Sequence, residues 1–259
     1  MTGRRPMPLR LDHLRQPILL SRGALLRLLA MLGGAVLLTA ASPAPQKNVV
    51  PAVVHRGTNW TVAVKAPADG AHLIGNPDAK VKLTEYISYT CPHCAHFNRE
   101  SEAALRMVFV GSGNGSIEVR PYIRNPVDLA ASLLVNCTDQ LHFLRLHDTF
   151  LNTQTEWMAR VAAVGDAQRD RWEKGPMPDR MRAIAGDLDF YHIMENAGFD
   201  RVQTDRCLND EAAMHRLAEQ TAAADKAGVQ GTPSFAIDGV VLTGTFDWKT
   251  LEPQLSARM

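Results

Sequence analysis

The sequence is poor in cysteine and in net charge, and both shortages limit what the protein is. Four cysteines in 259 residues are too few for a small domain held together by disulfides. A formal net charge of +1 lacks the basic excess that is usual in nucleic-acid binders, so we expect no nucleic-acid partner. With 46% hydrophobic and 21% charged residues, the composition excludes a chain that is mainly disordered.

Long apolar runs are also missing, apart from one near the N-terminus. Residues 1–41 carry six arginines against one aspartate and end in the apolar run 28–41. A basic segment, an apolar run and small residues behind it form the pattern of a secretory signal peptide. The run is shorter than the roughly 20 residues that span a bilayer, which favours a cleaved signal peptide. An uncleaved N-terminal anchor and a buried helix are the alternatives. We therefore expect a periplasmic or extracytoplasmic protein, whose remaining residues carry a net charge of −4.

The rest of the chain predicts strands at both ends of a long helical block. Residues 42–75 predict a linker with a short strand at 60–65. Residues rich in β-formers predict the strands 81–87 and 116–124, with a helix at 94–110 between them that ends at a glycine-rich segment. Apolar residues at helical spacing then predict a helical block, which includes helices at 181–197 and 210–227. Two strands, 233–237 and 240–242, and a helix at 247–255 follow, so the order of elements predicts an α/β fold.

The most informative segment is Cys91-Pro92-His93-Cys94, between a predicted strand and a predicted helix. There Cys91 lies near a helix N-terminus, where unpaired N–H groups and the helix dipole favour an anion. Such surroundings lower the pKa of a cysteine from about 8.5 to between about 3.5 and 7.5. Pro92 suits the first helical turn because its missing N–H would have no partner there. His93 adds positive charge or a hydrogen bond, and the two thiols predict a redox-active pair.

Other uses of such a cysteine pair fit less well. A structural zinc site needs four ligands, whereas Cys91, Cys94 and His96 supply three and the chain offers no second pair at a suitable spacing. Covalent haem attachment requires a histidine directly after the second cysteine, where this chain has Ala95. A purely structural disulfide across four residues constrains little of the chain.

A cysteine pair at this place, with Pro-His between its members, resembles the active site of DsbA-like thiol oxidases in the thioredoxin superfamily. Thr232-Pro233, just before a predicted strand, resembles the cis-proline loop that faces the cysteine pair in that superfamily. The helical block resembles the helical insertion of DsbA-like proteins. The resemblance covers residues 76–259. It implies a thioredoxin fold formed by 76–126 and 227–259, with an inserted helical domain at 127–226.

The resemblance also implies roles for residues outside the cysteine pair. Glu85 matches the buried acid that such enzymes place behind the second cysteine, where a raised pKa lets it exchange a proton with Cys94. The alternative is a glutamate at a strand edge that faces water. A cis bond before Pro233 would leave the backbone of Thr232 free to pair with an extended substrate peptide, whereas a trans proline that opens a strand is the alternative.

Cys137 and Cys207 both fall in the helical block. Four cysteines allow three pairings, and some DsbA-like relatives carry a second, structural disulfide. In an oxidising compartment we expect such a bond between Cys137 and Cys207. Free buried thiols or a resolving role in exchange are the alternatives.

The resemblance implies an exported thiol–disulfide oxidoreductase that needs no metal or organic cofactor. Its partners would be reduced or misoxidised exported proteins and a membrane quinone-linked re-oxidant of the DsbB type, and we expect a monomer. Three alternatives stay open. They are an isomerase or reductase kept in the dithiol form, a redox-inactive chaperone that binds peptides around Pro233, and a metal-delivery protein that uses the two thiols.

Overall fold

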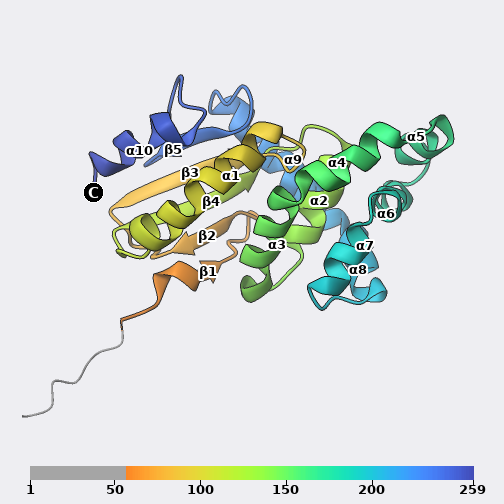
Figure 1. Ribbon diagram of the computed structural model, residues 1–259, viewed down its shortest axis with the longest axis horizontal. Coiled ribbons are helices and arrows are strands. Elements are labelled where there is room, and N and C mark those ends of the chain that lie inside the picture. Colours follow the sequence, from red (N-terminus) through yellow and green to blue (C-terminus); the bar gives the residue numbers. More distant parts are fainter. Residues whose placement is uncertain (1–56) are drawn as a thin grey trace, which may run out of the picture. The chain divides into compact units, whose positions relative to one another are not determined.

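The computed structural model describes residues 57–259, so the signal peptide or anchor predicted for residues 1–41 lies outside the described part. Helices cover a six-stranded sheet with the order β1-β2-β4-β3-β5-β6 (Figure 1). β3 and β4 run parallel, and the other neighbouring pairs are antiparallel. The α/β class predicted from the sequence is confirmed. The strands are β1 (Val64–Lys65), β2 (His72–Gly75), β3 (Val81–Ile87), β4 (Gly115–Pro121), β5 (Ser234–Ile237) and β6 (Val240–Val241).

β3 is a central strand, and its position places the residues that follow it. The strand is rich in β-branched and apolar residues and has the bounds that the sequence predicts. It pairs with β4 on one side, from Val81 opposite Gly115 onward, and with β5 on the other, where Glu85 lies opposite Phe235. Strands on both sides and helices over the sheet bury the middle of β3, and the cysteine pair follows directly after its end.

Two helices cover one face of the sheet and a third covers the other (Figure 1). α1 (Pro92–Ala104) lies in front of β3 and β4 and continues as the π-helical segment η2 (Leu105–Val110). α10 (Trp248–Ser256) packs beside α1, with the rings of Phe97 and Trp248 6.5 Å apart. α9 (Glu211–Lys226) contacts β4 from behind. These layers hold α1 firmly over the end of β3.

Within the helical block predicted at 127–226, several short helices precede α9, which contacts the sheet. The aromatic core of the block includes Phe190, whose ring meets those of Phe150 and Trp157 edge-on at 5.1 and 5.3 Å. The block lies beside the end of the sheet where β3 delivers the chain to α1 (Figure 1). The helices are α2 (Pro126–Asn136), α3 (Gln140–Asn152), α4 (Gln154–Ala163), α5 (Asp166–Glu173), α6 (Met177–Asp187), α7 (Phe190–Asn196) and α8 (Arg201–Leu208).

The single helix predicted over 181–197 is wrong, because the chain breaks it at Asp189. That residue has a φ of 66°, in the left-handed region that ends a right-handed helix. Aspartate tolerates this conformation better than most residues, and α7 restarts directly after it. The apolar spacing continued through the break, so periodicity alone did not reveal it.

The linker and strand predicted for residues 42–75 also need correction in their described part. The residues Trp60–Val62 form a short 3₁₀ helix, η1, because the Asn59 side chain accepts a hydrogen bond from the Thr61 N–H at 3.2 Å. Only Val64–Lys65 remains as strand β1. β2, which the sequence did not predict, pairs antiparallel with β4. Residues 60–75 therefore extend the sheet instead of leading up to it.

A disulfide joins Cys137, at the end of α2, to Cys207 in α8. The two residues are 70 positions apart in the sequence, so the bond closes most of the helical block into one loop. Cys91 and Cys94 are both unbonded. The structure thus separates the four cysteines into a bonded pair within the helices and a free pair at the start of α1.

Replacing Cys137 and Cys207 together with alanine is expected to lower the free energy of unfolding by about 4 kcal/mol. The loss follows from the larger conformational entropy of an unfolded chain without this 70-residue loop. Urea denaturation of the oxidised wild type and the double variant measures it, and thiol exchange at Cys91 should persist. Equal stability of the two proteins would show that the bond does not constrain the chain.

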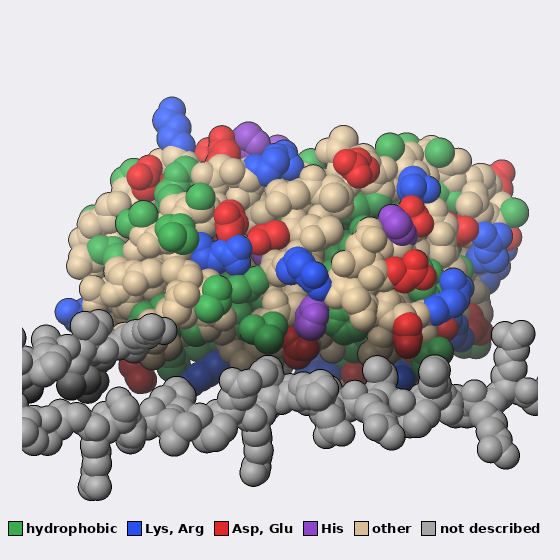
Figure 2. Space-filling view, turned by 60° about the horizontal axis from the view of Figure 1, so that its bottom comes forward, with side chains coloured by type: hydrophobic (Ala, Val, Ile, Leu, Met, Phe, Trp, Pro, Cys, Tyr) green, Lys and Arg blue, Asp and Glu red, His purple; other side chains and the backbone are tan. Residues whose placement is uncertain are grey.

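The surface of the described residues mixes charges of both signs. On the face shown in Figure 2, acidic and basic side chains alternate without a continuous patch of one sign. Within residues 57–259, no helix combines the length and the hydropathy needed to cross a bilayer.

Candidate active site

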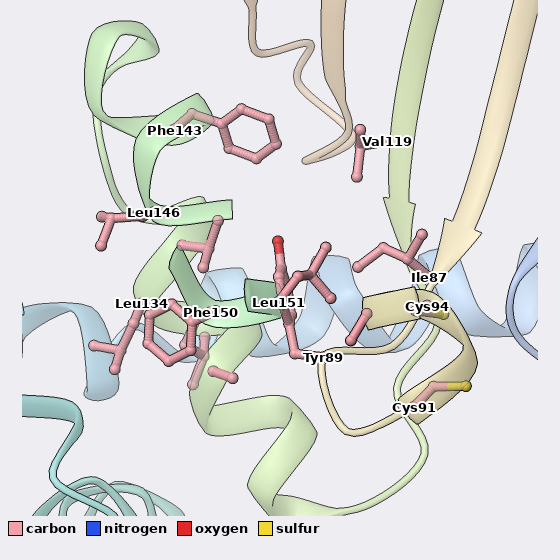
Figure 3. Packing of buried hydrophobic residues seen from close by; sticks show 14 of the residues in the cluster. Ile87, Tyr89, Cys91, Cys94, Val119, Leu134, Phe143, Leu146, Phe150 and Leu151 are labelled. Atoms are coloured by element: carbon pink, nitrogen blue, oxygen red, sulfur yellow. The ribbon is translucent and has the colours of Figure 1, made fainter. Parts of the chain in front are cut away.

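Cys91 caps the N-terminus of α1. The turn 88–90 carries the chain from β3 to Cys91, whose carbonyl accepts hydrogen bonds from the N–H groups of Cys94 at 3.1 Å and Ala95 at 3.3 Å. Pro92 occupies the first helical position, as the sequence predicts, so α1 starts two residues earlier than expected. Figure 3 shows both cysteines on this first turn, with Ile87 close to Cys94. The helix N-terminus therefore points at the sulfur of Cys91.

The surroundings of Cys91 favour its thiolate. The pKa of Cys91 falls from the ordinary 9.0 to about 5, first because the Cys94 thiol donates a hydrogen bond to it. Burial works against this effect, whereas Thr232 and the backbone N–H groups of Cys94 and His93 add to it. When Cys91 is a thiol, its Sγ donates to the Thr232 carbonyl at 3.0 Å. When it is a thiolate, the Thr232 hydroxyl, which is buried and has no hydrogen-bond partner among residues 57–259, is available to donate to it.

Cys94 has the opposite character. Burial raises its pKa well above the ordinary value, and its hydrogen bond to Cys91 raises it further. Its exposed fraction is only 1%. One thiol of the pair is therefore ionised at neutral pH while the other holds its proton, which suits a nucleophile beside a resolving partner.

Thr232 and Pro233 reach the cysteines from 141 positions further along the chain. The Thr232–Pro233 bond is cis, and Pro233 directly precedes β5. Because β5 pairs with β3, the loop before β5 lies beside the turn after β3. The structure thus brings together the two motifs that the sequence singled out.

Two shallow hollows flank this junction. Cys91, Pro92 and His93 line one of them together with Tyr122, Arg124 and Thr232. The other lies between α1 and the Thr232–Pro233 loop, and Phe246 lines it with 58% of its surface exposed. The imidazole of His93 is exposed and lines both hollows, and its backbone N–H lowers the pKa of Cys91.

The turn before Cys91 is held by two buried side chains that the sequence analysis missed. The Asp128 carboxylate in α2 accepts hydrogen bonds from the Ser88 hydroxyl at 2.6 Å and the Tyr89 N–H at 2.8 Å. The Gln154 amide in α4 donates to the carbonyls of Tyr89 at 2.6 Å and Cys91 at 2.9 Å. Asp128 follows a recognisable helix cap, but no local signal links either side chain to a turn at least 38 positions away.

Replacing Gln154 with leucine is expected to loosen this turn. Two buried carbonyls lose a partner, which costs about 2–3 kcal/mol of stability and displaces the Cys91 sulfur from the helix N-terminus. We expect the pKa of Cys91, measured by pH-dependent alkylation, to rise in this variant. Gln220→Leu is the matched control, because Gln220 is equally buried and donates to the Asp69 carbonyl far from the cysteines. The same pKa change in both variants would contradict a specific effect.

Glu85 is buried, with 5% of its surface exposed, so the alternative that it faces water is wrong. Its pKa is raised from 4.5 to about 8, first by burial and then by the negative charge of Asp148. Glu85 lies on the same face of β3 as Leu83 and Ile87, which is the face that α1 covers. One of its carboxyl oxygens has no hydrogen-bond partner among the described residues. At neutral pH this side chain can hold a proton or release one.

Among residues 57–259, the side chains form no group of three or more histidines, cysteines or acids that could hold a metal ion.

Comparison with solved structures gives the same fold. The protein-disulfide isomerase of Novosphingobium aromaticivorans is 48% identical to this chain, with a TM-score of 0.71 over 74% of this chain and 98% of that one. The alpha-DsbA1 of Wolbachia pipientis is 19% identical, with a TM-score of 0.59 over 78% of this chain and 96% of that one. The second likeness concerns the fold, a thioredoxin fold with a helical insertion, as predicted.

The sequence comparisons agree. A curated Rickettsia bellii protein, provisionally named a protein-disulfide oxidoreductase, is 27% identical over 170 residues, or 65% of this chain. The chain covers 57% of the length of that relative. The family model described as thioredoxin matches residues 68–257, which include Cys91, Cys94, Glu85 and Pro233. The chain therefore belongs to the thioredoxin family.

Proposed function

We propose that the protein exchanges disulfides with substrate proteins through Cys91 and Cys94. The observation that carries this proposal is the contrast between the two thiols on one helical turn. The pKa of Cys91 is lowered to about 5, whereas burial raises that of Cys94 well above its ordinary value. A single nucleophile beside a protonated partner is what stepwise exchange requires.

In the direction that oxidises the protein, the exchange proceeds in two steps. The Cys91 thiolate attacks one sulfur of a substrate disulfide, an S–S bond forms between them, and the other substrate sulfur leaves as a thiolate. Cys94 then gives its proton to the Glu85 carboxylate and attacks the Cys91 sulfur. The Cys91–Cys94 bond forms as the mixed disulfide breaks, and the second substrate sulfur also leaves as a thiolate, so that the reduced substrate takes its protons from solvent. Oxidation of a substrate runs through the same steps in reverse.

In this proposal Thr232 and Pro233 present the substrate to Cys91. The two hollows on either side of the loop give an extended peptide a path across the Cys91 sulfur. The backbone of Thr232 would pair with such a peptide as an added strand does. Exposed Phe246 offers an apolar contact to one of its side chains.

The proposal extends to an exported protein in the periplasm or another extracytoplasmic space, which acts as a monomer. Its substrates would be reduced or misoxidised exported proteins, and a membrane quinone-linked protein of the DsbB type would re-oxidise it. The disulfide between Cys137 and Cys207 supports this location, since such bonds persist outside the cytosol.

The direction of exchange distinguishes an oxidase from an isomerase or reductase. The strongly lowered pKa of Cys91 favours the dithiol form and hence an oxidising pair. Equilibration with glutathione measures the reduction potential, and an oxidase predicts a value nearer to about −120 mV than to the −270 mV or so of thioredoxin. A value near that of thioredoxin would instead favour a reductase or an isomerase. Of these two names, the Novosphingobium structure carries that of an isomerase.

Two serine variants test the exchange itself. Cys91→Ser is expected to abolish the oxidation of a reduced substrate protein, because it removes the nucleophile. Cys94→Ser is expected to accumulate a mixed disulfide between Cys91 and the substrate, visible by non-reducing electrophoresis and mass spectrometry. If the wild type exchanges no disulfide at all but still binds unfolded chains, the protein is a peptide-binding chaperone instead.

A further inference from the structure

A small cavity lies under α1 on the face of the sheet that carries Glu85. It has a volume of about 40 Å³, enough for water, and it reaches from β3 to α3. Glu85, Asn98 and Asp148 are among the polar side chains that line it. Asn98 follows Cys94 by four residues and so lies on the same face of α1, one turn from the buried thiol.

Two buried polar atoms in this cavity lack protein partners. One carboxyl oxygen of Glu85 and the side-chain nitrogen of Asn98 have no partner within hydrogen-bond distance among the described residues, although the Asn98 amide lies near enough to Asp148 to lower the pKa of that carboxyl. Both residues are more than nine-tenths buried. Buried polar groups are normally paired, so these two atoms indicate that the cavity holds water between them.

Asp148 stands where the cavity meets the surface. It lines the cavity, and with Arg106 it also lines an outer hollow that includes Val62 and Leu141. Its carboxylate is 3.0 Å from the Arg106 guanidinium, and its side chain is 23% exposed. Asp148 is therefore in contact with the inner cavity and with solvent at once.

Among the described residues, the other charged or titratable groups around Asp148 are Arg106, Glu102, His147 and Arg145, of which Glu102 also lines the cavity. Arg106 in η2 is a fixed cation that also pairs with Glu102 of α1 at 2.5 Å. His147, the neighbour of Asp148 in α3, has a pKa lowered to about 4 by burial and is neutral at pH 7. Arg145 faces the outer hollow, and β2 and β4 line the cavity with the apolar side chains of Ile74, Ile117 and Val119.

We propose that Asp148 connects Glu85 to solvent, so that a proton released by Cys94 passes from Glu85 through cavity water to Asp148 and out to the surface. In the reverse reaction the proton returns by the same route. No electron moves along it, since the S–S bonds form and break at Cys91 and Cys94. This inference rests on the proposed exchange function and assigns to α3, in the helical insertion, a part in that chemistry.

Asp148→Asn tests the route because the amide keeps the shape of the side chain but does not accept and release a proton. In single-turnover reactions with oxidised glutathione, Cys91 first forms a mixed disulfide, which Cys94 then resolves. We expect the resolving rate at its high-pH plateau to fall about tenfold in this variant. Asp148→Glu should restore the rate, and formate added to the Asn variant should restore it in part.

A purely electrostatic role predicts a different pH profile. Loss of the Asp148 charge would move the profile to lower pH, since that charge raises the pKa of Glu85, but it would leave the plateau unchanged. That outcome would overturn the route. Asp189→Asn is the control, since Asp189 also pairs with an arginine, Arg160, at 3.0 Å but lies in the helical block away from the cavity.

Asn98→Leu provides a second variant, which fills the cavity with an apolar side chain. It should lower the same plateau, and circular dichroism and thermal unfolding check that both variants fold. An unchanged plateau in both would overturn the route while the exchange function stands. A wild type that forms no mixed disulfide would overturn the exchange function, and the route with it.

Discussion

Glu85→Gln is expected to change the free energy of unfolding more favourably at pH 8 than at pH 4. The difference between the two effects should reach up to about 5 kcal/mol. Burial, with a further contribution from Asp148, raises the pKa of Glu85 in the folded protein from 4.5 to about 8. The folded state thus holds this proton more tightly than the unfolded state. The stability it contributes is fully present below pH 4.5 and is lost as the pH rises to about 8, at about 1.4 kcal/mol for each pH unit.

Urea denaturation of the reduced wild type and of the glutamine variant between pH 4 and pH 8 measures this difference. Subtracting the two curves removes the titrations of Cys91, Asp128 and other groups, together with any pH-independent effect of the buried amide. Glu252→Gln, an exposed residue of α10, is the control and should leave the pH dependence unchanged. Parallel curves for Glu85→Gln and the wild type would mean that Glu85 titrates in the folded protein as it does in water.

The same substitution separates the role of Glu85 in exchange from its cost in stability. If Glu85 takes the proton of Cys94, Glu85→Gln should slow dithiol oxidation and product release by about a hundredfold while the protein stays folded. An acid that is costly to ionise in a buried strand would then be retained for its chemistry. Unchanged exchange kinetics in the glutamine variant would leave Glu85 with no part in the reaction.

The sequence predicts the cysteine site well because the signals are local. A strand, the Cys91-Pro92-His93-Cys94 segment and a helix follow one another within a few residues, and the helix geometry then dictates the environment of the first sulfur. Thr232 and Pro233 were found by resemblance, and the pairing of β5 with β3 explains why a loop so distant in sequence reaches Cys91. The environment of Cys91 can therefore be predicted from the local sequence, whereas the contact with Thr232 and Pro233 needed the resemblance.

The supporting residues could not be predicted in this way. Asp128, Gln154 and Asp148 act through side chains that cross between α2, α4 or α3 and the turn or cavity beside α1. Their sequence neighbours look like ordinary amphipathic helices, and only tertiary packing decides which polar residue points inward. β2 was missed for a related reason, since its four residues gain their strand character from pairing with β4.

Cys91 is expected to react with iodoacetamide at a rate that stays constant down to about pH 6 and falls to half near pH 5. With a pKa of about 5 the thiol is about 99% ionised at pH 7, against about 1% for a pKa of 9.0. Cys94, whose pKa burial raises, should remain unmodified over the same range. Mass spectrometry of the labelled peptides distinguishes the two cysteines. A midpoint above pH 8 for Cys91 would contradict the thiolate on which the proposed function depends.

Thr232→Val is expected to raise this midpoint by about one pH unit, because it removes the buried hydroxyl available to the thiolate and keeps the carbonyl. A higher pKa weakens the dithiol form by about 1.4 kcal/mol, which makes the reduction potential more negative by about 30 mV. Thr232→Ser retains a hydroxyl and should keep both values near those of the wild type. If the valine and serine variants have the same midpoint, the hydroxyl has no effect, and the Cys94 thiol and the backbone N–H groups of the first turn of α1 lower the pKa of Cys91 without it.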